Sequence, residues 1–173
     1  MYQIRKVDRN DNNAVDLITR RCMETVLETI PEFQGDPQIA RRTFSNFTFE
    51  EMRNMLVTSL TKPEHEILVA IKEDVQQIVA HSIFSIKKDN KNISYGFCYS
   101  RYVNPDHRQQ GLGSRLLKEQ ENWWVQRNAK YAVAQTHTTN IKLKKLFEKH
   151  GFIASKPQQG TFSHIVLTKR FMT

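Results

Sequence analysis

Between residues 102 and 113 the chain reads Tyr102-Val103-Asn104-Pro105-Asp106-His107-Arg108-Gln109-Gln110-Gly111-Leu112-Gly113. Upstream, residues 93–103 are rich in aromatic and β-branched side chains and predict a strand. Downstream, apolar residues recur at helical spacing and predict a helix over residues 113–127. A strand, a glycine-rich loop and a helix in this order are typical of a phosphate-binding site, because the first amides of a helix have no internal partner.

The loop itself suits an anion. Gly111 and Gly113 present no side chain to an approaching ligand and can adopt backbone angles that other residues avoid. Arg108 adds a positive charge to the partial charge of the helix dipole. The loop is not a Walker loop, because no Gly-Lys-Ser/Thr follows, and it is not a Rossmann fingerprint, because the preceding strand belongs to an antiparallel meander. A structural role for both glycines, in the turn and in close packing, is the alternative.

The other elements build an α+β sandwich outward from this loop. Short turns join strands 66–71, 75–86 and 93–103 into an antiparallel meander. The remaining predicted elements are a strand at 2–7, helices starting near Asp11 and Thr48, a strand at 131–137, a helix at 140–150, and strands at 152–154 and 162–169. We expect one domain over residues 1–173, with a central mixed, mostly antiparallel sheet of about seven strands flanked by about four helices. Strands 93–103 and 131–137 should run parallel.

Composition narrows the class of protein. The 173 residues suit one domain, and 39% hydrophobic with 25% charged residues is ordinary for a globular chain. No apolar run approaches the ~18 residues of a membrane span, and the charged N-terminus is no signal peptide. We therefore expect a cytoplasmic protein with no membrane partner. Cys22 and Cys98 lie in periodic apolar segments, which indicates buried thiols, and their spacing predicts no metal site.

The charge balance favours an anionic partner. Lys and Arg number 26 against 18 Asp and Glu, for a net charge of +8. Such a surface attracts either nucleic acid or a polyphosphate cofactor. Because the basic residues are scattered in small clusters and form no dense run, nucleic acid is the disfavoured of the two.

Two segments of the chain resemble the motifs of a known family. The stretch from Tyr102 to Gly113 is similar to the core motif of the GNAT superfamily of N-acetyltransferases, in which a Val-x-Pro-like break precedes Arg/Gln-x-x-Gly-x-Gly/Ala at the start of a helix. The block from Asn140 to Phe152 is similar to the family's Asn-x6-Tyr-x-x-x-Gly-Phe segment. The resemblance covers nearly the whole chain and implies acetyl-CoA as co-substrate, without a metal.

The resemblance also implies roles for individual residues. Backbone groups of Tyr102 and Val103 would pair with the pantetheine arm, and a backbone N–H near Val103 would hold the oxyanion. Arg108 and Gln109 would lie at the entrance of the loop, Asn140 would reach the cofactor, and Phe147 would lie near the thioester. The diphosphate would bind the amides of Gln110, Gly111, Leu112, Gly113 and Ser114.

Two positions depart from the family pattern. Phe147 stands where many members carry a tyrosine general acid, and Gln135 stands where some carry a carboxylate base. A thiolate with a pKa of about 8.5 can leave without an acid. His137, two residues beyond Gln135 on the same strand face, is the preferred base. His81, Tyr95 and Tyr99 are rivals.

The acceptor is predicted only as a primary amine. Residues 28–49 carry Glu28, Glu32 and Asp36 among several phenylalanines, which suits a cationic amine or, alternatively, a turn closed by a hydrophobic plug. The predicted function is acetyl transfer from acetyl-CoA to this amine. The alternatives are a catalytically degenerate CoA-binding module and, less favoured, a basic nucleic-acid-binding protein. Edge strands near the C-terminus leave a homodimer open.

Overall fold

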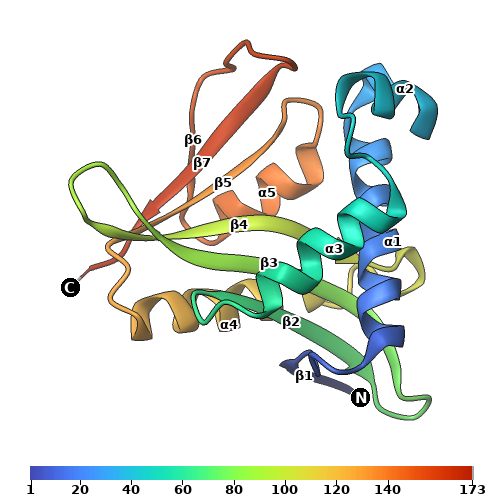
Figure 1. Ribbon diagram of the computed structural model, residues 1–173. Coiled ribbons are helices and arrows are strands. Elements are labelled where there is room, and N and C mark those ends of the chain that lie inside the picture. The colour runs from blue at the N-terminus through green and yellow to red at the C-terminus, as the bar shows by residue number, and fades with distance from the viewer. Residues whose placement is uncertain (173) are drawn as a thin grey trace.

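The computed structural model describes residues 1–172 and contains one seven-stranded sheet with the order β1-β2-β3-β4-β5-β7-β6 (Figure 1). The strands are β1 (Tyr2–Lys6), β2 (His65–Lys72), β3 (Gln77–Lys88), β4 (Ser94–Val103), β5 (Tyr131–His137), β6 (Ile153–Ala154) and β7 (His164–Arg170). The helices are α1 (Asn12–Thr29), α2 (Pro37–Thr43), α3 (Phe49–Leu60), α4 (Leu112–Gln126) and α5 (Ile141–Lys149), with 3-10 turns η1 (Pro31–Phe33) and η2 (Pro105–His107).

The predicted architecture is confirmed. β4 and β5 run parallel and every other neighbouring pair of strands is antiparallel. The described chain has one helix more than expected, because Asp36 caps the main-chain N–H of Gln38 at 2.7 Å and Pro37 preorganises the first turn of α2. β3 also begins later than predicted, since Val75 lies in the preceding turn.

β2 shows how the two layers of helices are held. Its six central residues are all buried, as expected for a strand covered on both faces. Ile67, Val69 and Ile71 point toward α1 and α3 and join Ile18 and Leu60 in one core cluster. The alternate side chains of β2 point into a second cluster beneath α4 and α5, which includes Leu68, Phe84, Leu116, Trp124 and Leu167.

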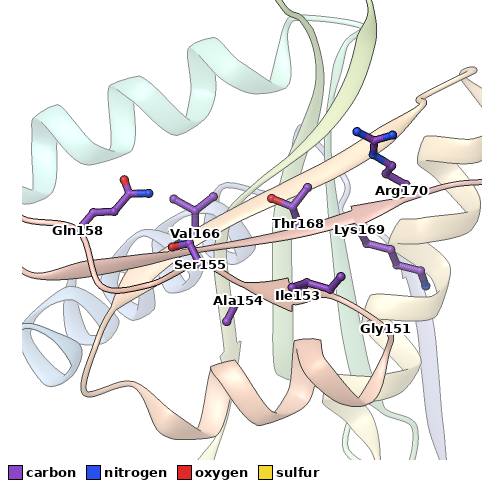
Figure 2. Close-up of a pocket in the computed structure, with 9 residues that line it drawn as sticks. All are labelled: Gly151, Ile153, Ala154, Ser155, Gln158, Val166, Thr168, Lys169 and Arg170. Carbon is purple, nitrogen blue, oxygen red and sulfur yellow. The ribbon is translucent and has the colours of Figure 1, made fainter.

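The sheet ends in a short edge strand. β6 pairs with β7 through only two residue pairs, a length that limits edge-to-edge association. An open groove of about 640 Å³ lies along this edge (Figure 2). Its lining consists of Gly151, Ile153, Ala154, Ser155, Gln158, Val166, Thr168, Lys169 and Arg170. None of the residues predicted to bind the cofactor lines it.

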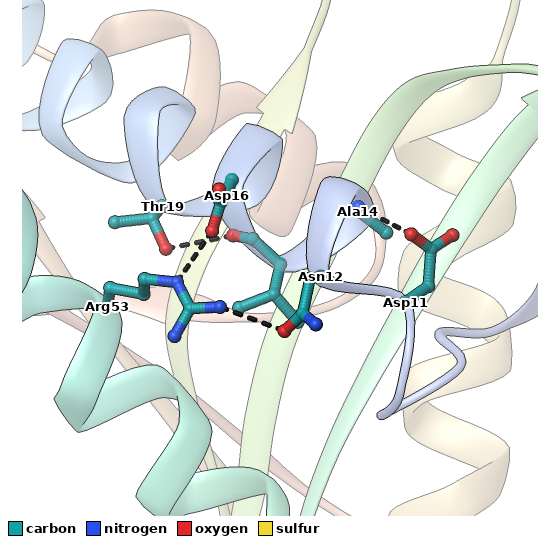
Figure 3. A network of polar contacts seen from close by, with 7 residues as sticks. Asp11, Asn12, Ala14, Asp16, Thr19 and Arg53 are labelled. Carbon is teal, nitrogen blue, oxygen red and sulfur yellow. Dashed lines mark hydrogen bonds and ion pairs between the residues drawn. The ribbon is translucent and has the colours of Figure 1, made fainter.

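A polar network fixes α1 against α3 (Figure 3). Arg53 of α3 donates to the Asp16 carboxylate at 2.6 Å and to the side-chain oxygen of Asn12 at 2.9 Å. Asp11 caps the first turn of α1 by accepting from the N–H of Ala14 at 3.0 Å. The network lies at the end of α1 remote from η1, so it positions the helix without entering the predicted site.

Gly96 allows α4 to approach the sheet. A Cβ atom built at Gly96 would lie 2.3 Å from the Trp124 ring. That ring is fully buried and its Nε1 donates to the main-chain oxygen of Ser85 at 2.8 Å, so it has no room to move. The closeness of α4 to β4 therefore depends on the missing side chain.

We expect Gly96→Ala to lower the free energy of unfolding by about 1–3 kcal/mol, the usual cost of overpacking a rigid core. Urea denaturation followed by tryptophan fluorescence measures it. The matched control is Gly160→Ala, because its added methyl meets only ordinary contacts from 3.6 Å outward. Equal stability of the two variants would contradict the packing argument.

Candidate functional site

The two parallel strands β4 and β5 part halfway along their length. They pair only from Tyr95 with Tyr131 to Cys98 with Ala134. Beyond this apex β4 remains paired with β3 as far as Val103, and β5 remains paired with β7 as far as His137. Residues 99–103 and 135–137 thus form two diverging segments, called here the splay.

The ladder between β3 and β4 determines which backbone groups face the splay. The N–H of Asn104 donates to the main-chain oxygen of Val79 at 2.8 Å. Because hydrogen-bonded pairs alternate along an antiparallel ladder, Tyr102 pairs with β3, whereas Arg101 and Val103 direct their N–H and C=O groups toward β5. The backbone groups of Tyr102 therefore face β3 and not the splay, contrary to the expectation, and Arg101 presents its backbone to the splay beside Val103.

The predicted loop opens α4 directly beyond the splay. Gly111 is the N-cap residue, in the left-handed conformation at φ 74°, and no side chain caps the helix. Asp11, Asp36, Thr48 and Asn140 cap the other four α-helices of the described chain. The N–H groups of residues 109–114 have no acceptor within the described chain. Six consecutive amides at a helix N-terminus are the donors that a phosphate group requires.

The two glycines of the loop serve different purposes. Gly111 needs its positive φ, and a Cβ there would meet nothing within 4 Å, so the loop is open to the outside. Gly113 is held close to α5, since a Cβ there would lie 3.3 Å from Leu146. Gln109 also has a positive φ, of 61°. The functional interpretation of Gly111 and the close-packing interpretation of Gly113 thus both have support.

Side chains of the loop itself and of the edge strand β1 hold the loop in place. Arg108 turns back and donates from Nε to the main-chain oxygen of Val103 at 2.9 Å. The hydroxyl of Tyr2, in the edge strand β1, donates to Oε1 of Gln110 at 2.6 Å and lies 2.9 Å from Nδ1 of His107. These contacts tie the loop to the end of β4 and to the edge of the sheet.

Asn140 and Phe147 take mainly structural positions. Asn140 accepts from the N–H of Leu143 at 3.2 Å and donates to the Thr136 hydroxyl at 2.9 Å, so it joins α5 to the end of β5. Phe147 is fully buried, and its ring packs edge-on against Phe152 at 4.7 Å between centroids. A contact of either residue with the cofactor stays a prediction.

His137 lies at the end of the splay, near η1. Its Nε2 atom is 3.4 Å from Oε2 of Glu32, and its Nδ1 accepts from the main-chain N–H of Thr139 at 3.2 Å. Gln135 is exposed, one residue past the apex. The structure thus brings His137 and an acidic residue of the predicted acceptor segment together, while its role as base stays a prediction.

The rival bases differ in their surroundings. His81 is fully buried, with Nε2 3.3 Å from the Ser100 hydroxyl. Burial, together with the charges of Arg21 and Arg101, lowers the pKa of His81 to about 3. Such an imidazole is a poor proton acceptor at neutral pH.

The two tyrosines lie at opposite ends of the paired segment of β4, Tyr95 at its start and Tyr99 directly beyond the apex. Tyr95 stacks on Tyr131 at 5.1 Å, and Tyr99, 46% exposed, is the first β4 residue beyond the apex. The Tyr99 hydroxyl accepts from the Ser85 hydroxyl at 3.3 Å. Tyr99 is thus the rival nearest to the parting strands.

The phenylalanines of the predicted acceptor segment form a plug. Phe33, Phe44 and Phe162 pack edge-on at 5.1–5.9 Å between centroids, and Phe33 and Phe47 are buried. They attach η1 and α2 to the loop before β7. These aromatic residues therefore form the hydrophobic plug that was the alternative to a cationic-amine site.

Arg101 is the site residue that the sequence pattern did not single out. Its guanidinium donates to the main-chain oxygen of Gly113 at 2.8 Å, to Ser82 at 3.2 Å and to Gln120. A lone arginine within an apolar strand was the available signal. It could not be interpreted without knowing that this strand face packs on the first turn of α4.

Among residues 1–172, no helix combines the length and the apolar character that a membrane span needs. Within the same residues, no group of three or more His, Cys, Asp or Glu side chains is placed to hold a metal ion. A cytoplasmic location and a homodimer stay predictions.

Known proteins resemble this chain in sequence and in fold. The Arabidopsis thaliana protein named Probable N-acetyltransferase HLS1 is 25% identical over 158 residues, which cover 85% of this chain but only 38% of that protein. The PaiA N-acetyltransferase of Thermoplasma acidophilum, solved with coenzyme A, superposes with a TM-score of 0.73 at 17% identity, covering 99% of both chains. The ribosomal-protein-S5-alanine acetyltransferase of Vibrio fischeri gives 0.71 at 16% identity, covering 98% of this chain and 92% of that one.

The family model described as the Acetyltransferase (GNAT) family matches residues 26–152, a span that runs from the last turn of α1 through α5 and includes the splay and the loop. With the parallel strands β4 and β5 and the loop that opens α4 in their predicted places, this chain belongs to the GNAT acetyltransferase family.

Proposed function

We propose that the chain transfers an acetyl group from acetyl-CoA to a primary amine by direct attack of the amine on the thioester. The observation that carries the proposal is the run of six unpartnered amides at residues 109–114, at the mouth of the splay. A diphosphate on these amides would leave the pantetheine arm to extend along β4 toward the apex. The N–H and C=O groups of Val103 and Arg101 would pair with it, as a partial added strand.

The remaining predicted contacts fit around this arm. Arg108 and Gln109 would border the diphosphate, and Asn140 would approach from the end of β5. Phe147 would form part of the wall behind the thioester. Near the apex, a backbone N–H of the splay would hold the oxyanion, and Val103 is the predicted donor. Arg101, two residues nearer the apex, offers a second N–H that faces the splay.

The chemistry then needs one proton acceptor. The attacking amine must lose a proton as its nitrogen bonds to the carbonyl carbon, and the electron pair of the broken C–S bond leaves with the CoA sulfur. His137 is proposed to take that proton, with the Glu32 carboxylate at 3.4 Å balancing the charge gained. Phe147 cannot protonate the thiolate, which is a fair leaving group on its own.

A second candidate function rests on the two departures from the family pattern. With Phe147 and Gln135 in place of an acid and a base, the chain could bind CoA without turnover. Binding and catalysis are therefore tested separately.

CoA and acetyl-CoA should raise the melting temperature of the protein, and Gly111→Glu should abolish the effect, because a carboxylate would enter the phosphate site. At a hundredfold excess over Kd the stabilisation is about 2.7 kcal/mol, or roughly 5–10 °C. Gly35→Glu is the matched control, since Gly35 has a similar positive φ of 72°, is equally open and lies outside the loop. The absence of any shift at millimolar CoA would contradict the proposal.

A panel of primary amines with acetyl-CoA, assayed by thiol release, should show turnover, and His137→Gln should lower kcat by about 100-fold or more with little effect on KM for acetyl-CoA. Tight CoA binding without turnover on any amine would favour the binding module. An unchanged kcat in His137→Gln would remove His137 as the base.

His81 should remain neutral and act only on stability. Its folded pKa of about 3 lies below the ordinary 6.5, so the unfolded chain takes up its proton first and stability falls as the pH drops from 6.5 toward 3. This group should account for a loss of about 2 kcal/mol between pH 7 and pH 5. Denaturant titrations of the wild type and His81→Gln measure the difference, and an NMR titration of His81 near pH 6.5 would contradict it.

A further inference from the structure

Three arginines surround the first turn of α4, and each donates to a backbone carbonyl. Arg108 donates to Val103, Arg101 donates to Gly113, and Arg115 donates to the main-chain oxygen of Tyr2 at 2.9 Å. Within residues 1–172, no carboxylate lies within 4.0 Å of any of the three. Three positive charges without a contacting counter-ion therefore lie around the first turn of α4, besides the positive end of the helix dipole.

Arg101 differs from the other two because it points into the protein. Its side chain lies between β4 and α4, with Ser82 and the fully buried Gln120 accepting from Nη1 and with the guanidinium 5.6 Å from the Phe147 ring centroid. Nε2 of Gln120 has no partner, so the amide has its oxygen toward the cation. Burial lowers the pKa of Arg101 below its ordinary value, against the smaller opposing influences of Cys98 and Glu121.

An isolated charge in this position is costly in the free protein. A guanidinium that is partly removed from water, as in the half-buried Arg101, needs a counter-charge to offset its desolvation, and neutral oxygens offset it only in part. The positive end of α4 adds repulsion, since Gly113 is the second residue of that helix. An anion on the amides of residues 109–114 would supply the missing counter-charge and would offset the repulsion from the positive end of α4.

We propose that Arg101 is an internal counter-charge for the cofactor diphosphate, which holds the splayed half of β4 to the first turn of α4 and strengthens cofactor binding through its charge. The inference rests on the proposed function. It assigns a binding and positioning role to a side chain that would not touch the ligand. The same residue offers its backbone to the splay, so the charge lies directly beneath the path of the arm.

The test measures CoA affinity by calorimetry in the wild type, Arg101→Met and Arg101→Lys, each checked for folding by circular dichroism. Arg101→Met should weaken CoA binding at least tenfold, because it removes the charge and keeps much of the volume. Arg101→Lys should stay within about threefold of the wild type, because it keeps the charge without the guanidinium hydrogen bonds. The salt dependence of log Kd should become shallower in Arg101→Met alone.

Arg21→Met is the matched control. Arg21 is buried, whereas Arg101 is half-buried; like Arg101, Arg21 has no carboxylate partner within 4.0 Å among the described residues and donates to a backbone carbonyl, that of Ile78 at 2.9 Å. It belongs to α1, which packs against the opposite face of the sheet from α4. We expect its CoA affinity to change by less than threefold.

The outcomes separate the two proposals. If the wild type does not bind CoA, the proposed function fails. If the wild type binds and Arg101→Met binds equally well, only the role of Arg101 is overturned. Equal losses in Arg101→Met and Arg101→Lys would also overturn it, since hydrogen bonding and not charge would then be responsible. Should Arg101→Met not fold, the CoA affinity of Arg101→Lys and the salt dependence of the wild type still test whether the charge of Arg101 strengthens binding.

Discussion

The parting of β4 from β5 is the constraint on which the rest of the site depends. Each strand has a second partner that continues past the apex at Cys98 and Ala134, β3 for one and β7 for the other. The two strands can therefore diverge while each keeps its ladder to its other neighbour, which in β4 is interrupted only by a bulge at Tyr99, directly beyond the apex. Only one edge of each strand is left without a ladder, and these are the edges that an extended ligand can use.

The position of α4 follows from the same strand. Gly96 lets the Trp124 ring lie on β4 before the apex, while Arg101 holds the first turn of the helix beyond it. One contact depends on a missing side chain and the other on a long charged one. Between them they place the free amides of the loop at the mouth of the splay, where a diphosphate and an extended arm could be bound together.

The structure shows where part of the positive charge of the chain lies. A net charge of +8 says nothing about where an anion binds. The structure shows three arginines around one helix N-terminus, satisfied by carbonyl oxygens of β1, β4 and α4. Elsewhere, cations such as Arg53 and Lys169 are paired with the carboxylates of Asp16 and Glu121. The positive charges around the loop are thus not neutralised by a contacting carboxylate of the described chain.

The sequence alone was sufficient for the order of elements, the parallel pairing of β4 with β5 and the loop that opens α4, because these depend on local periodicity, turn chemistry and a motif of adjacent residues. It was insufficient for Arg101 and for the backbone of Tyr102, because the alternation of the β3–β4 ladder decides which groups face the splay. The environment of His81 and the aromatic plug at Phe33, Phe44 and Phe162 were also decided by tertiary contacts. Burial, charge and edge contacts between segments far apart in the chain exist only once the sheet has formed.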